Sequence, residues 1–250
     1  MLQRSFRTLS RKLTARTMST APTKTVNLEV TSDTVCPFCY VGYNRLNQAI
    51  RELKAEGVDA DFKLKFAPFQ LDPTLPLSPG ENKRERYQRR FGGEEKVRLM
   101  EQAMLQRGRE CDPPIEFSYG GNVSNTKDSH RVLEKAYAVG GEEVQRKVAE
   151  KLFTLYFEKE GDIGSHAALA QAAAESGVFP STAEAEAFLA SDELKKEVEQ
   201  GFVKAQMRGI SGVPFTIING QFGLSGAQET QTFKEVLRKI VEGKLEVEED

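Results

Sequence analysis

The chain has 250 residues, of which 39% are hydrophobic and 29% charged, the ordinary composition of a globular protein rather than of a disordered or fibrous one. Its formal net charge of −2 gives no reason to expect nucleic acid or an anionic membrane surface as a partner. No apolar run approaches the roughly 20 residues that span a bilayer, and three cysteines are too few for a disulfide-stapled secreted scaffold.

Residues 1–25 are basic and rich in Ser and Thr, and they contain no acidic residue. Apolar residues recur there at helical spacing: Leu2, Phe6, Leu9 and Leu13. This composition predicts a cleaved transit peptide and a location in the mitochondrial matrix. Two alternatives remain, a disordered basic tail or translation from Met18, which would leave a cytoplasmic protein.

The next segments predict a βαβ unit. Residues 26–30 alternate apolar and polar side chains, as a short strand does, and residues 60–66 repeat the pattern. Between them we expect a helix that begins at or just after Cys36 and ends at Gly57. Such a unit normally has parallel strands and a right-handed crossover.

Four prolines between residues 68 and 80 indicate an irregular connection. From residue 81 to about 190 every periodic segment is helical and no strand is expected, which predicts an inserted helical subdomain. The expected helices are 94–109, 129–139, 142–159, 165–176 and 183–189.

Residues 193–208 predict a further helix. The Asn219-Gly220 pair then predicts a hairpin of strands 215–218 and 221–224, followed by a helix over 227–241. The chain is thus divided into a first α/β part (26–70), a helical insertion (71–190), a second α/β part (191–243) and an acidic tail (244–250).

Cys36 and Cys39 form a C-x-x-C pair at the strand-to-helix junction, which is typical of redox-active thiols. A helix N-terminus stabilises an anion, so Cys36 is predicted to be the more exposed and more acidic thiol and the nucleophile. Cys39, three residues on, is predicted to attack the resulting mixed disulfide. Structural zinc needs four ligands, and the remaining candidates, Cys111, His130 and His166, lack ligand-like spacing. No metal is expected.

Pro214 lies just before the predicted hairpin. Because proline cannot donate a hydrogen bond inside a central strand, it is expected to begin its strand. The Val213–Pro214 bond is of the type for which cis is accessible, and the C-x-x-C upstream favours cis. An ordinary trans proline is the alternative.

Several motifs together resemble the FrnE-like branch of the DsbA family of thioredoxin-fold oxidoreductases. The first is Ser32-Asp33-x-x-Cys36-Pro37-Phe38-Cys39-Tyr40-Val41-Gly42, in which Phe38 replaces the usual Trp. The others are Asn125-Thr126-x-x-Ser129-His130-Arg131, Leu152-Phe153-x-x-Tyr156-Phe157 with Gly161-Asp162-Ile163, and Gly212-Val213-Pro214. The resemblance extends over about residues 26–242.

The resemblance implies an α/β, thioredoxin-like fold with an inserted all-helical subdomain, and a substrate groove between the two. It further implies that the backbone of Val213 docks an extended substrate or glutathione beside Cys36. The implied binding residues are Val213, Pro214, Pro37, Phe38, Asn125 and His130. A helix histidine such as His130 is also often only structural. We expect no tightly bound cofactor, glutathione as a possible co-substrate, and thiol- or disulfide-containing clients.

Two other functions compete with disulfide exchange. Kappa-type glutathione transferases and 2-hydroxychromene-2-carboxylate isomerases resemble this chain, but they typically have Ser at the position of Cys36, and a serine hydroxyl forms no mixed disulfide. A non-catalytic, chaperone-like client-binding module is the other. Cys111 is interpreted as an isolated thiol, with regulatory oxidation as an alternative, and His166 as structural or solvated.

Overall fold

The central sheet of the computed structural model, which describes residues 24–245, has the strand order β2-β1-β5-β6. Its strands are β1 (Lys24–Ser32), β2 (Ala60–Pro68), β5 (Phe215–Ile218) and β6 (Phe222–Ser225). β1 and β2 are parallel, whereas β5 runs antiparallel to both β1 and β6. The transit-peptide prediction for residues 1–25 lies almost wholly outside the described residues, as does most of the predicted acidic tail.

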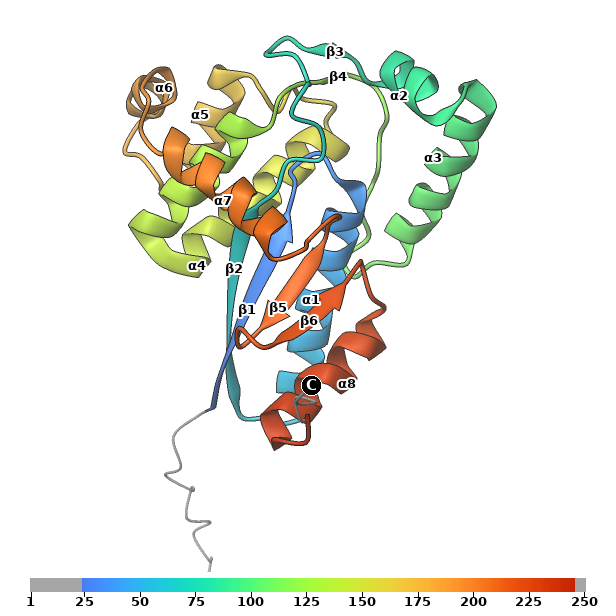
Figure 1. The fold of residues 1–250 in the computed structure, drawn as a ribbon, viewed down its shortest axis with the longest axis vertical. Coiled ribbons are helices and arrows are strands. Elements are labelled where there is room, and N and C mark those ends of the chain that lie inside the picture. The colour runs from blue at the N-terminus through green and yellow to red at the C-terminus, as the bar shows by residue number, and fades with distance from the viewer. Residues whose placement is uncertain (1–23, 246–250) are drawn as a thin grey trace, which may run out of the picture.

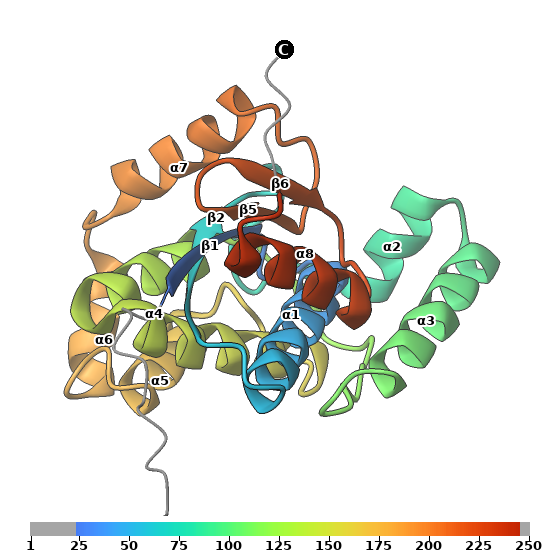
Figure 2. The same cartoon turned by 90° about the horizontal axis from the view of Figure 1, so that it is seen from below.

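One face of the sheet is apolar because alternate residues of each strand point to it. Val26, Leu28 and Val30 of β1 are at most 2% exposed. Their partners in the parallel register are Phe62, Leu64 and Phe66 of β2. Helices α1 (Pro37–Ala55) and α8 (Thr230–Glu242) pack together on this side, and α7 (Lys195–Met207) lies on the other (Figure 2).

The predicted βαβ unit and hairpin are both confirmed. α1 begins at Pro37 with Cys36 as its N-cap residue. Between β5 and β6, Asn219 and Gly220 have φ values of 52° and 72°, the left-handed conformations of a type I′ turn, and the Gln221 N–H closes this turn by donating to the Ile218 carbonyl oxygen at 3.0 Å.

The insertion between β2 and α7 is largely helical and lies in two groups on opposite sides of the molecule (Figure 1). One group is α2 (Lys83–Phe91) and α3 (Glu94–Arg109). The other comprises α4 (Lys127–Phe157), α5 (His166–Glu175) and α6 (Thr182–Ala190). Among residues 24–245 no helix is both long and apolar enough to cross a membrane.

The prediction that no strand interrupts this insertion was wrong. β3 (Glu81–Asn82) and β4 (Asn122–Val123) pair in a small antiparallel sheet. Strands of two residues are too short to show alternation, and their pairing joins segments some 40 residues apart, so local patterns carry no sign of it.

α4 bends at a pair of glycines, where separate helices over 129–139 and 142–159 were predicted. Gly140 and Gly141 have non-helical backbone angles, and Gly141 has φ 62° and ψ −153°. That combination is available to glycine and strained for other residues. The glycine pair interrupts the helix, so the two predicted helices are confirmed as the two arms of α4.

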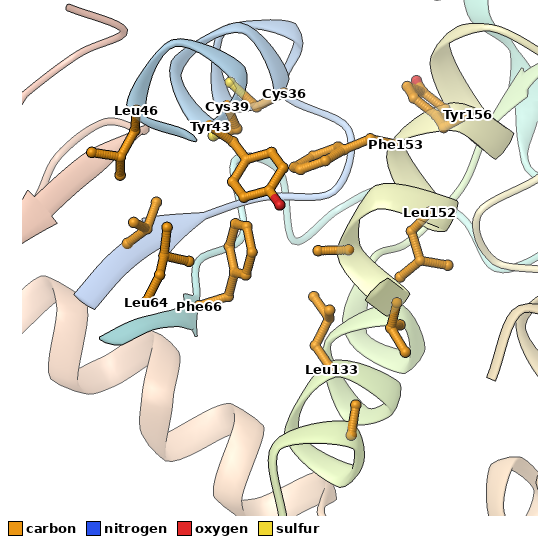
Figure 3. Packing of buried hydrophobic residues seen from close by; sticks show 14 of the residues in the cluster. Cys36, Cys39, Tyr43, Leu46, Leu64, Phe66, Leu133, Leu152, Phe153 and Tyr156 are labelled. Atoms are coloured by element: carbon orange, nitrogen blue, oxygen red, sulfur yellow. The ribbon is translucent and has the colours of Figure 1, made fainter. Parts of the chain in front are cut away.

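The second arm of α4 attaches to the free edge of β2. Both the N–H and the C=O of Phe66 are bonded to the Gln145 side-chain amide, at 2.8 and 3.1 Å. Beside this contact, Tyr43 of α1 lies between Phe66 and Phe153 of α4, with ring centroids 5.3 and 6.3 Å away (Figure 3). The Gln145 amide thus makes the two backbone hydrogen bonds that a neighbouring strand would make to Phe66. The aromatic contacts of Tyr43 connect the insertion to the apolar core.

Candidate active site

The C-x-x-C pair lies where β1 passes through a tight turn into α1. The N–H of Cys36 donates to the carbonyl oxygen of Asp33 at 3.1 Å, which closes this turn. No side chain caps α1, and its first turn contains no acidic residue. The sulfur of Cys36 therefore stands at the positive end of a 19-residue helix.

The two thiols have different surroundings. Cys36 is 4% exposed and Cys39 fully buried, in the order predicted. Burial raises the pKa of the Cys39 thiol well above its ordinary value, and the neighbouring Cys36 adds to this rise. The Ser32 side chain and the Asp33 backbone partly oppose this rise in the pKa of Cys39. Cys39 is thus held protonated and within reach of its partner, as a resolving thiol requires.

The strand-start proline faces the dithiol. The Val213–Pro214 bond is cis, as predicted, and the Cys36 thiol donates to the Val213 carbonyl oxygen at a sulfur–oxygen distance of 3.6 Å. Gly42 of α1 permits this approach, because a Cβ there would lie 3.0 Å from Cγ of Pro214. The backbone of Val213 is therefore beside the reactive sulfur.

A hollow of about 370 Å³ opens next to this contact. Phe38, with 43% of its surface exposed, lies on its wall with Val213 and Pro214. The complete lining is Phe38, Val41, Arg45, Arg107, Val213, Pro214, Gly226, Ala227 and Glu229. Pro37 occupies the first position of α1, next to Cys36. Four of the predicted binding residues are thus gathered at the dithiol.

His130 lies behind the active-site turn rather than in this hollow. It is 2% exposed and its ring meets that of Phe202 edge-on at 5.5 Å. Nε2 of His130 is 3.6 Å from Oδ1 of Asp33, and neither atom has a hydrogen-bond partner among the described residues. The other Asp33 oxygen accepts the N–H of Leu71 at 2.7 Å. His130 thus faces the turn that positions Cys36.

Asn125 lies on a different cavity, of about 610 Å³, together with Asp128 and His166. Its Nδ2 donates to the carbonyl oxygens of Pro73 and Leu75, at 3.3 and 3.2 Å, so the amide secures the proline-rich connection. The structure does not bring Asn125 to the hollow beside Cys36. Its part in binding glutathione stays a prediction.

His166 and Cys111 have local partners. Nε2 of His166 is 2.9 Å from Oδ2 of Asp128. The Cys111 thiol donates to the Arg107 carbonyl oxygen at 3.4 Å, and burial raises its pKa to about 11. Cys111 is accordingly protonated at neutral pH and a poor nucleophile. In the described part of the chain no three His, Cys, Asp or Glu side chains are grouped to hold a metal ion.

Three residues near the site carried no functional interpretation in the sequence. Asp33 occurs within the motif of residues 32–42, and no motif in the sequence includes Arg107, which lies in the predicted helix 94–109. Tyr87 of α2 is the third: burial raises the pKa of its hydroxyl, and a charge on Cys36 adds to that rise. Tyr87 and Arg107 belong to the insertion and lie some 50 and 70 residues from Cys36 along the chain, so local patterns do not report their position, whereas Asp33 belongs to the same turn as Cys36.

Comparison with known proteins agrees with this arrangement. The family of DSBA-like thioredoxin domains matches residues 27–238. A probable DsbA oxidoreductase from Streptomyces coelicolor superimposes with a TM-score of 0.77 at 22% identity, over 90% of this chain and 93% of its own. The cytosolic disulfide reductase DsbM from Pseudomonas aeruginosa, solved with GSH, gives 0.57 at 13%, over 86% and 99%.

A 2-hydroxychromene-2-carboxylate isomerase shares the fold as well, with a TM-score of 0.61 at 15% identity, over 87% of this chain and 97% of its own. No curated protein sequence gives a significant match. At these identities the solved structures establish the fold, and they include both oxidoreductases and an isomerase.

Proposed function

The chain belongs to the family of DSBA-like thioredoxin domains, and we propose that it catalyses thiol–disulfide exchange through Cys36 and Cys39. One observation carries the proposal. The Cys36 sulfur stands at the uncapped N-terminus of α1, donates to the Val213 carbonyl oxygen and has a buried second thiol, Cys39, three residues on in the first turn of the helix. These are the surroundings that nucleophilic attack followed by resolution requires.

In the reductive direction the Cys36 thiolate attacks one sulfur of a client disulfide. The client S–S bond breaks, its second sulfur leaves as a thiolate, and a mixed disulfide forms at Cys36. Cys39 then loses its proton and attacks the Cys36 sulfur, which releases the client as a dithiol. Two electrons pass from the cysteine pair to the client, and the reverse sequence oxidises a client dithiol.

Glutathione is the proposed co-substrate that returns the pair to its reduced form, two molecules yielding one glutathione disulfide. A reducing role is what a mitochondrial matrix or cytoplasmic location favours, because both compartments keep thiols reduced. The basic composition of residues 1–25 supports the matrix. The proposed binding surface is the hollow formed by Phe38, Val213 and Pro214 beside Cys36.

Trapping of the mixed disulfide tests this mechanism. Reduced Cys39→Ser protein, mixed with a cysteine-containing peptide disulfide, is expected to gain the mass of one peptide at Cys36, because nothing resolves the intermediate. The wild type is expected to finish as the intramolecular disulfide without bound peptide. Cys36→Ser, the matched control, is expected to gain none.

Other outcomes decide between the competing functions. Failure of Cys39→Ser to trap peptide, with glutathione-dependent turnover retained in Cys36→Ser, would identify a kappa-type transferase or isomerase. Client binding that survives both substitutions without any exchange would identify a binding module.

A further inference from the structure

Arg107 lines the hollow, and its guanidinium group forms no ion pair with any of the described residues. Its guanidinium carbon lies 5.8 Å from the centre of the Phe38 ring, and Nη1 donates to the Ala103 carbonyl oxygen of the same helix at 3.2 Å. No carboxylate of residues 24–245 lies within 4.0 Å of its nitrogens. The half-buried cation therefore has an aromatic support but, in the part of the chain that the structure describes, no acidic partner.

The second arginine of the hollow is already neutralised. Arg45, with 8% of its side chain exposed, forms an ion pair with Glu229 at 2.8 Å and donates to the Ala227 carbonyl oxygen at 3.1 Å. Glu229 neutralises the charge of Arg45, so the charge of Arg107 is the one without a counter-charge among the residues described in this hollow. The last two turns of α3, residues 102–109, add Arg109, and the Glu110 carboxylate that follows them accepts a hydrogen bond from Gln106 at 2.8 Å.

The N-terminus of α1 adds positive potential to the hollow, whereas the last turn of α3, which carries Arg107, is the negative end of its own helix. The N-terminus of α1 points at Cys36 without an acidic residue in its first turn. Arg107 and the Val213 backbone line the same small hollow, so a chain docked at Val213 passes near the guanidinium. Guanidinium and carboxylate groups match as charge-assisted, bidentate partners.

The geometry points to a carboxylate-binding subsite at Arg107 that selects substrates in which an acidic group lies within about one or two residues of the reacting cysteine sulfur. The Phe38 ring holds the guanidinium in place, and Glu229 disfavours a second carboxylate on the Arg45 side. Both glutathione and an acidic segment of a protein carry this chemistry. The inference rests on the proposed function only in placing the reacting sulfur at Cys36.

Binding without chemistry tests the subsite. Peptides with S-methylcysteine followed by Glu, Gln or Lys, together with S-methylglutathione, are titrated into the reduced protein at an ionic strength of about 0.02 M, where screening is weak. The wild type is expected to bind the Glu peptide about fivefold more tightly than the Gln peptide, the effect of one partly exposed ion pair. The Lys peptide is expected to bind more weakly than both.

Arg107→Gln is expected to bind the Glu and Gln peptides equally. Arg109→Gln, which removes the same charge from an exposed position on the same helix, is expected to keep the fivefold preference. Tighter binding of S-methylglutathione than of the Glu peptide would identify the small thiol as the source of the carboxylate, and the opposite order a protein client.

Exchange rates separate this inference from the proposed function. Rates that depend on Cys36, together with no Arg107-dependent preference for the Glu peptide, would overturn the subsite alone. An Arg107-dependent preference in binding, together with no Cys36-dependent exchange, would overturn the oxidoreductase mechanism alone. Absence of measurable binding of the Glu peptide to the wild type would also contradict the subsite.

Discussion

The thioredoxin-like part and the helical insertion differ in the buried contacts that stabilise them. The sheet and α1 meet through apolar side chains such as Val26, Leu28 and Leu46, each at most 1% exposed. The insertion meets the sheet and the active-site turn through buried polar groups as well. Gln145 pairs with Phe66, and the Ser129 and Thr34 hydroxyls are 2.8 Å apart.

The insertion also relies on polar groups within itself. Arg131 is fully buried and donates to four carbonyl oxygens, those of Phe188, Leu189, Ser191 and Glu193, at 2.8–3.1 Å. Apolar contacts tolerate small shifts, whereas a buried hydrogen bond is lost when its partner moves. The difference indicates that polar contacts fix how the insertion sits over the dithiol, while apolar burial supplies most of the stability.

Gln145→Leu tests this difference most severely. It keeps the approximate size of the side chain but leaves the N–H and C=O of Phe66 buried without partners, a loss of about 4 kcal/mol in the free energy of unfolding. Urea unfolding measures it. Gln171→Leu, on the exposed side of α5, is expected to change stability by less than about 0.5 kcal/mol. Equal effects of the two substitutions would show that the polar contact at the sheet edge is unimportant.

Lys83, a buried polar residue of the insertion, is expected to make the free energy of unfolding depend on pH. Burial lowers its pKa from 10.5 to about 8, and Nζ donates to the Tyr156 carbonyl oxygen at 3.1 Å. Between these two pH values the unfolded chain binds the proton more tightly than the folded protein does, so this residue makes stability rise with pH. The expected rise between pH 7 and 9.5 is about 2 kcal/mol.

Urea unfolding of the wild type and Lys83→Met over this pH range isolates the effect as a difference between the two proteins. The exposed Lys96→Met, on α3, serves as the control and is expected to follow the wild type. If the free energies of unfolding of the wild type and Lys83→Met differ by the same amount at every pH in this range, the lowered pKa of Lys83 is contradicted.

Gly42→Ala tests the apolar packing of α1 in the thioredoxin-like part, and the smallest effect on stability is expected here. The added methyl group would lie 3.0 Å from Cγ of Pro214 and 3.2 Å from Cα of Ala227. The helix preference of alanine, roughly 1 kcal/mol, offsets much of this crowding, so stability is expected to change by less than about 1 kcal/mol. Exchange with a peptide disulfide is expected to slow about threefold, because the Val213 backbone moves relative to Cys36.

Alkylation of Cys36 by iodoacetamide, which requires no docked chain, serves as the internal reference for Gly42→Ala. An equal slowing of alkylation and exchange would contradict a role for the Val213 backbone in docking the substrate.

The same contrast explains which features the sequence could predict. Alternation in β1 and β2, the Asn219-Gly220 turn and the C-x-x-C at a helix start are local, and each predicted its element within a few residues. The placement of Arg107 over Phe38 joins residues some 70 positions apart, and the facing of Asp33 and His130 some 100 apart. Such contacts depend on how the insertion packs, which no periodicity records. The β3–β4 pair was missed for the same reason.

The redox equilibrium of the Cys36–Cys39 pair tests the central claim most directly. The protein is equilibrated in glutathione redox buffers, and free thiols are counted by alkylation and mass measurement, with Cys36→Ser as the control. The account predicts a reversible two-electron couple between about −270 and −120 mV that disappears in Cys36→Ser. Absence of such a couple in the wild type, or its persistence in Cys36→Ser, would contradict it.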